Sequence, residues 1–356
     1  MTVKAMVLGA PGRLTNTKLP SRDAETGAWL AVEATMLSNN EVQAWNGDRP
    51  DIVYPLIPGG QVVGRIADHI DDSFDIPIGT RVVVEPLIRC GTCLACSRDL
   101  AKCTRRKPVN AYGALPVTEA PGLWGGLAER LYLDPHASLH QVSDDNPAAV
   151  ATFVHPLASS YTAMKQLAKI QPGETVLIMG PGPRGLACLI AAQAVGASWI
   201  GVSGLDVDAD RLDVAKRLGA NTIIDVSTED LGMEVANALG TRPDVVVDVT
   251  SGDPEAIYSG LEVVRSGGRL VFGSMHGIRP LTQFFSDIVV SKQLTILGAR
   301  GASQEGYEWA CQQLETDPRL DDMVSHQFPL DESERAIQAT GGMLGREELI
   351  SVAVTF

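Results

Sequence analysis

The sequence predicts an α/β protein with two domains: a β-rich domain over residues 1–150 and a doubly wound parallel sheet domain over residues 151–297. Three observations support this. A chain of 356 residues exceeds one hydrophobic core of ordinary size. Its first third is a series of short β-type runs separated by Gly, Pro and Asp. From about residue 175 it alternates strand-type and helix-type segments, which is typical of a parallel sheet covered by helices.

The β-rich domain is predicted from runs of β-branched and aliphatic residues bounded by turn residues. These runs are KAMVL at 4–8, AWLAVEAT at 28–35, QVVGRIA at 61–67 and TRVVVEP at 80–86.

The second domain begins with the strand TVLIMG at 175–180, the turn GPGPRG and the helix LACLIAAQAVGA, and WIGVSG at 199–204 is the next strand. This order predicts a βαβ unit. The pattern continues with the strands DVVVDVT and GRLVFGS and with the helices RLDVAKRLG and PEAIYSGLEVV. QLTILGAR, the helix EGYEWACQQLE, the segment FPLDESERAIQAT and a last strand in ELISVAVTF follow.

Composition excludes several classes of function. Apolar residues make up 45% and charged residues 20%, as in globular proteins, and no apolar run is long enough to cross a bilayer. The formal charge of −14 opposes sequence-independent attraction to nucleic acid. The start, MTVKAMVLGAPG, lacks the pattern of a secretion signal. We therefore expect a cytoplasmic protein that acts on a small molecule, with neither membrane nor nucleic acid as partner.

A glycine motif, GxGxxG, lies between the first strand and the first helix of the βαβ unit and predicts a dinucleotide site. Gly180 permits the tight turn, Gly182 allows the backbone to approach a pyrophosphate, and Gly185 lets helix and strand pack closely. The predicted cofactor contacts also include Pro183, Arg184, Ser203, Gly204, Arg211, Thr250, Gly273 and Ser274.

The choice between NADP and NAD is expected at the end of the second strand. Gly204 stands where an NAD enzyme places an acidic residue, and Ser203, Arg211 and Lys216 are available to a 2′-phosphate, which favours NADP. Asp206 and its acidic neighbours argue for NAD instead, since Asp206 can replace the missing acid after a small loop shift.

Four cysteines gather in one loop rather than spreading as a disulfide framework would. Their number and spacing predict a closed structural zinc site, one zinc per chain, and four protein thiolates leave no position open for substrate. The predicted ligands are Cys90, Cys93, Cys96 and Cys103.

The cysteine lobe followed by GPGPRG resembles the medium-chain dehydrogenase/reductase family, and most closely its zinc-containing alcohol and polyol dehydrogenases. IPGGQVVG at 57–64, GGLAERL at 125–131 and VSHQFPLDES at 324–333 extend the resemblance over nearly the whole chain. It implies a GroES-like catalytic domain, a Rossmann domain, a return of residues 298–356 to the first domain and a homodimer or homotetramer. One departure is a gap between Cys96 and Cys103 that is one residue shorter than usual.

The resemblance also implies where a catalytic zinc would be bound, and three of those positions carry no competent ligand. Ser38 aligns with the family's Cys, and Gly60 and Gln61 align with the His and Glu of its GHE motif, whereas His155 falls at the last ligand position. We therefore expect no catalytic zinc. Asn40 falls where the family's proton-relay hydroxyl lies.

The expected activity is hydride transfer between nicotinamide and an alcohol or ketone, with His155 as acid or base, because imidazole titrates near neutral pH. Ser38, Asn40 and Gln61 are candidate donors to a developing oxyanion. Arg184 replaces an aliphatic residue and either reaches the cofactor's phosphates or extends to solvent. Three alternatives are a reductase of an activated C=C or C=N bond, a non-catalytic cofactor-binding protein, and a dehydrogenase whose zinc is held by a new ligand set that includes His155.

Overall fold

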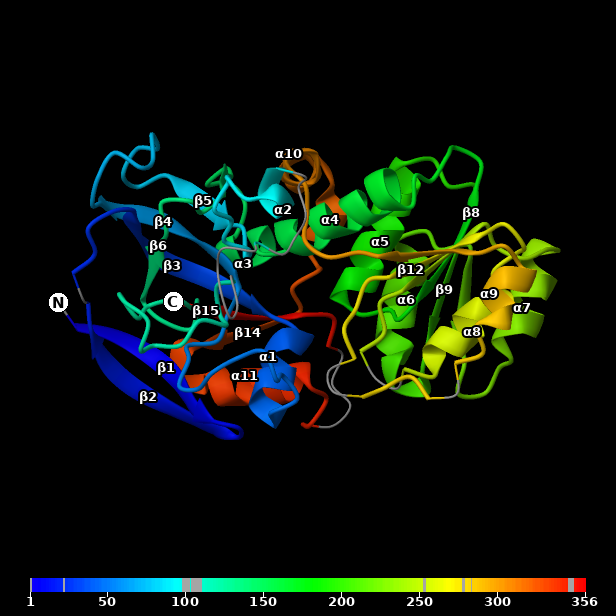
Figure 1. Ribbon diagram of the computed structural model, residues 1–356, viewed down its shortest axis with the longest axis horizontal. Coiled ribbons are helices and arrows are strands. Elements are labelled where there is room, and N and C mark those ends of the chain that lie inside the picture. Colours follow the sequence, from blue (N-terminus) through cyan, green and yellow to red (C-terminus); the bar gives the residue numbers. More distant parts are fainter. Residues whose placement is uncertain are drawn as a thin grey trace. The chain divides into compact units, whose positions relative to one another are not determined.

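The computed structural model describes residues 2–21, 23–97, 103, 111–251, 254–276, 279–282, 284–344 and 349–356 (Figure 1). The chain forms two compact units, one of residues 1–155 and 311–356 and the other of residues 156–310. Among the described residues, no helix has both the length and the apolar character needed to cross a membrane.

The first unit is built on a mixed sheet in the strand order β14-β15-β3-β4-β5-β7, with β6 also paired to β3, beside a β1–β2 hairpin. Its strands are β1 Thr2–Ala10, β2 Arg13–Pro20, β3 Ala28–Leu37, β4 Gln61–His69, β5 Arg81–Val84, β6 Arg130–Leu133, β7 Leu139–Gln141, β14 His326–Pro329 and β15 Val352–Thr355. Its helices are α1 Asn39–Asn46, α2 Leu94–Ser97, α3 Ala148–Ala151 and α11 Ser333–Thr340.

The second unit is a six-stranded parallel sheet in the order β10-β9-β8-β11-β12-β13. Its strands are β8 Thr175–Met179, β9 Trp199–Gly204, β10 Thr222–Asp225, β11 Val245–Asp248, β12 Arg269–Phe272 and β13 Thr295–Gly298. The helices that follow and precede them are α5 Pro183–Ala194, α6 Ala209–Arg217, α7 Leu231–Leu239, α8 Ala256–Val263 and α9 Asp287–Ser291. The two boundaries between the units fall within helices, namely α4 Val154–Tyr161 and α10 Gln304–Thr316.

Central strands of the second unit are buried on both faces, so their sequences are continuous apolar runs rather than alternating ones. In β8, Val176, Leu177 and Ile178 have no exposed surface. Helices α5 and α6 contact β9, and α8 contacts both β11 and α7 (Figure 1). The expected α/β class with a doubly wound parallel sheet is confirmed.

The return to the first unit begins at Cys311, later than the expected residue 298. The start of α10 stays with the second unit because it packs closely on α4. A Cβ at Gly306 would lie 2.6 Å from the Ala158 carbonyl oxygen, and Thr162 Oγ1 and Ser303 Oγ lie 3.2 Å apart.

Candidate functional site

The glycine motif forms the turn from β8 into α5, and its three glycines differ in their surroundings. Gly180 has φ 99°, and its N–H donates to Ser203 O at 2.9 Å. Gly182 caps α5 without a side-chain hydrogen bond, and a Cβ there would meet nothing within 4 Å. A Cβ at Gly185 would lie 1.8 Å from Gly180 O, so only glycine fits. The free N–H groups of the α5 N-terminus, beside open space at Gly182, fit an incoming pyrophosphate.

Because their surroundings differ, we expect substitution of Gly185 to lower stability and substitution of Gly182 to weaken cofactor binding. Gly185→Ala should destabilise the second unit by about 1–3 kcal/mol, because its methyl group overlaps backbone. Gly182→Ala should leave the thermal midpoint within about 1 °C and instead weaken dinucleotide binding about tenfold or more, since its methyl group would occupy the space that the pyrophosphate approaches. Thermal unfolding and cofactor titration measure the two effects. Equal affinity in Gly182→Ala and wild type would contradict this assignment.

The other predicted cofactor residues lie at the carboxyl ends of neighbouring strands, where doubly wound sheets bind their ligands. Ser203 and Gly204 end β9, and Gly273 and Ser274 follow β12. Thr250 follows β11, and its N–H and Oγ1 donate to Asp248 Oδ1 at 3.0 and 2.6 Å.

Close packing at the end of β9 explains why residue 204 is a glycine and not an acidic residue. A Cβ at Gly204 would lie 2.7 Å from Pro181 Cγ, so a side chain there would require the glycine turn to shift. Arg211 forms an ion pair with Asp208 at 3.0 Å, and the backbone N–H of Asp206 donates to Ser227 Oγ. A 2′-phosphate would therefore have to compete with Asp208 for the Arg211 guanidinium.

Arg184 does not extend to solvent. Its guanidinium donates to the carbonyl oxygen of Gly273 and, at 3.4 Å, to that of Ala299. Burial lowers the pKa of the Arg184 guanidinium, and its Nε is buried with no hydrogen-bond partner among the described residues.

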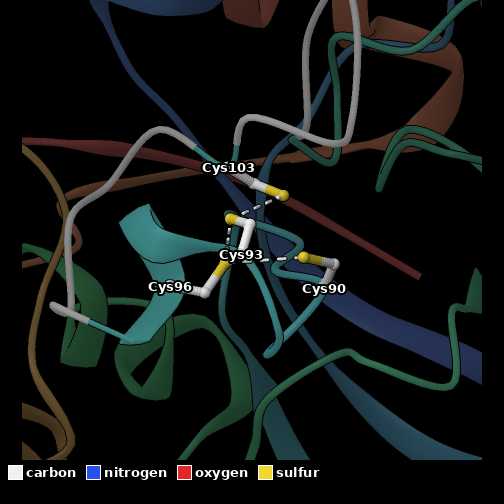
Figure 2. A group of neighbouring side chains, drawn as sticks. All are labelled: Cys90, Cys93, Cys96 and Cys103. Atoms are coloured by element: carbon white, nitrogen blue, oxygen red, sulfur yellow. Dashed lines mark hydrogen bonds between the residues drawn. The ribbon is translucent and has the colours of Figure 1, made fainter.

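The four cysteines converge as the spacing predicts, and Figure 2 shows their sulfur atoms turned toward one another. All four sulfurs lie within 4.8 Å of one another, with Cys93–Cys96 at 3.4 Å, Cys90–Cys96 at 3.9 Å and Cys93–Cys103 at 4.0 Å. A tetrahedral site with Zn–S bonds of about 2.3 Å requires sulfurs about 3.8 Å apart. These distances are far too long for disulfides, so the set fits a four-thiolate metal site.

The surroundings of the cysteines shift the thiol pKa values of Cys90 and Cys96 in opposite directions. The backbone N–H of Thr92 donates to Cys90 and lowers the pKa of that thiol to about 7. Burial, together with the neighbouring Cys93, raises the pKa of Cys96 to about 11. Cys96 is therefore protonated at neutral pH unless a cation compensates its thiolate.

Ser38, Asn40 and Gln61 come together because β3 and β4 pair with Met36 opposite Gln61, and α1 begins just after β3. Ser38 is the N-cap of α1: its Oγ accepts from the Asn40 N–H at 3.2 Å and donates to Glu41 Oε2 at 2.8 Å. Asn40 is exposed. Gln61 Oε1 is buried and has no hydrogen-bond partner among the described residues. His155 comes from a different element, the first turn of α4, and is half-buried.

The capping role of Ser38 gives a test that separates stability from catalysis. Ser38→Ala should reduce the free energy of unfolding by about 1 kcal/mol, because α1 loses its capping box. Ser38→Asn should lose less, since Asn caps helices well. Urea unfolding measures this, and kcat measured in parallel should change less than about threefold in both variants if the hydroxyl serves only as a cap.

Gly60, which the resemblance aligns with the His of the GHE motif, has no space for a side chain. A Cβ at Gly60 would lie 2.8 Å from the Tyr112 carbonyl oxygen, so any larger residue requires the backbone to move. This steric restriction could not be recognised from the sequence, because it depends on Tyr112, far along the chain.

One pair of ionisable residues was missed by the sequence analysis. Asp248, at the end of β11, is 1% exposed, and its Oδ2 lies 3.4 Å from His276 Nε2. The only sequence signal was a His shortly after the strand GRLVFGS, in a loop without any motif.

The parallel sheet, the glycine turn and the four-cysteine cluster are together typical of a dinucleotide-binding oxidoreductase. Residues 25–144 match the alcohol dehydrogenase GroES-like domain family, and residues 183–316 match the zinc-binding dehydrogenase family. The chain belongs to the medium-chain dehydrogenase/reductase family, in its zinc-type alcohol dehydrogenase branch. It is an NAD(P)-dependent oxidoreductase of the alcohol dehydrogenase type.

The relatives support the same assignment. The chain is 34% identical over 335 residues to a "probable alcohol dehydrogenase" of Mycobacterium tuberculosis, covering 92% of this chain and 88% of that protein. It is 30% identical over 341 residues to an erythritol/L-threitol dehydrogenase of Mycolicibacterium smegmatis, covering 91% and 90%. The crystal structure of an alcohol dehydrogenase from Thermotoga maritima shares the fold, with a TM-score of 0.87, 22% identity and coverage of 100% and 99%.

Proposed function

We propose that the protein transfers hydride between NADP(H), or NAD(H), and an alcohol or ketone without a catalytic zinc. The observation that carries this proposal is the steric restriction at Gly60, where the family's His cannot be accommodated beside the Tyr112 carbonyl. Removal of that ligand, together with the replacements at Ser38 and Gln61, leaves too few donors for an open catalytic zinc site.

In this mechanism the protein must handle a proton and stabilise charge on the substrate oxygen. His155 is the proposed acid or base, holding the proton that the substrate oxygen gains on reduction and loses on oxidation. The side-chain NH₂ groups of Gln61 and of the exposed Asn40 can donate hydrogen bonds to the substrate oxygen. The hydroxyl proton of Ser38 is already donated to Glu41, so its proposed role is to position α1. The nicotinamide supplies or accepts the hydride when bound.

The zinc belongs, in this proposal, to the four-cysteine lobe alone, at one ion per chain. The sulfur separations support this assignment because they match the edges of a zinc–thiolate tetrahedron. The proposal also includes a cytoplasmic homodimer or homotetramer. Strand β13 lies at the edge of the six-stranded sheet and is available for pairing with a second copy.

The proposal is tested by metal analysis combined with a substrate panel. Purified protein should contain about one zinc per chain, bind NADPH or NADH, and oxidise or reduce simple alcohols or ketones in the presence of a chelator. About two zinc per chain, or activity that a chelator abolishes and zinc restores, would refute a zinc-free reaction. Turnover of α,β-unsaturated carbonyls or iminium compounds alone would favour the C=C or C=N reductase. Cofactor binding without turnover would favour a non-catalytic role.

A further inference from the structure

Arg184 lies where both the helix dipole and burial make a positive charge unfavourable. It is the second residue of α5, near the positive end of the helix dipole, and its guanidinium is desolvated. Among the described residues, no carboxylate forms an ion pair with it, and the guanidinium donates to the carbonyl oxygens of Gly273 and Ala299. An uncompensated buried charge in such a place is a candidate for function.

The sheet order shows which half of a dinucleotide Arg184 would approach. The order β10-β9-β8-β11-β12-β13 corresponds to the doubly wound order 3-2-1-4-5-6, in which the ribose of the adenosine half is recognised at the end of the second strand, here β9. A bound dinucleotide would therefore place its nicotinamide half over β11, β12 and β13. Gly273 and Ala299 directly follow β12 and β13, so the Arg184 guanidinium lies on the nicotinamide side.

We propose that Arg184 provides a fixed positive charge at the nicotinamide half of the cofactor site, so that the protein binds the reduced dinucleotide more tightly than the oxidised one. This inference rests on the proposed function, because it assumes that the glycine motif binds a nicotinamide dinucleotide.

The physical reason is a difference of one charge. The oxidised nicotinamide ring carries a positive charge and the reduced ring is neutral, whereas the phosphates are the same in both forms. Attraction between Arg184 and the phosphates therefore cancels in the ratio of the two affinities, and repulsion of the oxidised ring remains. Two unit charges about 8 Å apart in a medium with an effective dielectric constant of about 20 repel by an energy that corresponds to roughly 10- to 100-fold in such a ratio.

One nearby carboxylate acts in the opposite direction. Asp248 also lies at the carboxyl edge of the sheet, but its Oδ1 accepts from Thr250 and its Oδ2 faces His276 Nε2 at 3.4 Å. Oδ2 makes no hydrogen bond in the described part of the chain, so the charge of Asp248 offsets part of the repulsion from Arg184, and the affinity ratio measures the net effect of the two groups.

The chemical consequence is a shift in the redox balance of the bound cofactor. Tighter binding of the reduced form raises the reduction potential of the bound couple by about 30 mV for each tenfold in the affinity ratio. The bound oxidised nicotinamide thus becomes the stronger hydride acceptor. In a protein that lacks a zinc ion to activate the alcohol, this charge activates the acceptor instead.

The test is the ratio Kd(NADP⁺)/Kd(NADPH), measured by calorimetry and nicotinamide fluorescence in the full-length protein without substrate, and repeated with NAD⁺ and NADH. The wild-type ratio should exceed about ten. Arg184→Gln, which keeps a hydrogen-bond donor but removes the charge, should reduce the ratio by about 10- to 100-fold. Arg184→Lys should stay within about threefold of wild type. Arg217→Gln, on the exposed face of α6, is the matched loss of charge and should not change the ratio.

Several results would overturn the inference. A wild-type ratio of one or less does so without any variant, even if Arg184→Gln fails to fold. An equal loss of affinity for both forms in Arg184→Gln would show that Arg184 only links β12 to β13, and equal ratios in the Lys and Gln variants would show that charge is irrelevant. If the wild-type protein binds neither form of either dinucleotide, the proposed function fails first.

Discussion

Replacing Cys93 with Ser should abolish zinc binding and lower the free energy of unfolding by about 4 kcal/mol or more, the largest stability effect expected in this protein. Cys93 is buried, and its sulfur lies within 4.0 Å of both Cys96 and Cys103, so its loss removes a ligand from the centre of the cluster. The three remaining thiols cannot close a tetrahedral site. Zinc content by elemental analysis and the thermal midpoint measure the two effects.

Cys311→Ser provides the matched control, because Cys311 is a half-buried free thiol on α10, outside the cluster. This variant should retain about one zinc per chain. If Cys93→Ser retains full zinc content and its wild-type midpoint, the four cysteines do not form the metal site. A strong chelator should mimic Cys93→Ser in the wild-type protein, and more readily at low pH, because the thiolates must compete with protons.

The second unit was the part of the fold most accessible from the sequence. Its central strands are buried on both faces and therefore appear as uninterrupted apolar runs such as TVLIM, and its first turn carries three glycines at fixed spacing. Two of these glycines meet a local requirement: Gly180 has φ 99°, and a Cβ at Gly185 would overlap the Gly180 carbonyl. Local sequence is sufficient here because the constraint lies within one βαβ unit.

Elements without an apolar face were missed. Strand β2, with the sequence RLTNTKLP, is mostly exposed and pairs only with β1 in a two-stranded sheet, so it shows no hydrophobic alternation. Strand β2 is held by backbone pairing along nearly the whole length of β1. The first pair joins Thr2 to Pro20, and the last joins Ala10 to Arg13. Such pairing is a long-range property that composition does not record.

In the candidate site, too, features set by neighbouring residues could be predicted from the sequence, whereas contacts between distant residues could not. The cysteine spacing predicted that the four sulfur atoms would converge, as they do, and the capping role of Ser38 could have been recognised from the S-x-x-E pattern of Ser38 and Glu41. The restriction at Gly60 depends on Tyr112, and the partners of Arg184 follow strands far along the chain. No pattern within a short window contains those contacts.

Replacing His155 with Ala should reduce kcat by about two to four orders of magnitude while leaving the Kd for NADPH within about threefold, if His155 is the proton donor and acceptor. The expected separation follows from its role: a group that moves a proton in the transition state contributes to kcat and not to dinucleotide binding. His155→Gln should lose nearly as much, because a neutral amide can hydrogen-bond to the substrate but cannot accept the proton. The limb of the pH–rate profile that reports this group should disappear in both variants.

His136→Ala is the control, because His136 is a half-exposed residue that faces Asp134 on the surface of the first unit. It should retain wild-type kcat and an unchanged pH profile. A His155→Ala variant that keeps more than about a tenth of the wild-type kcat would assign the proton transfer to another group. If the wild-type pH profile persists in that variant, His155 only packs at the start of α4, and Gln61 and Asn40 would have to polarise the substrate by hydrogen bonding, with water delivering the proton.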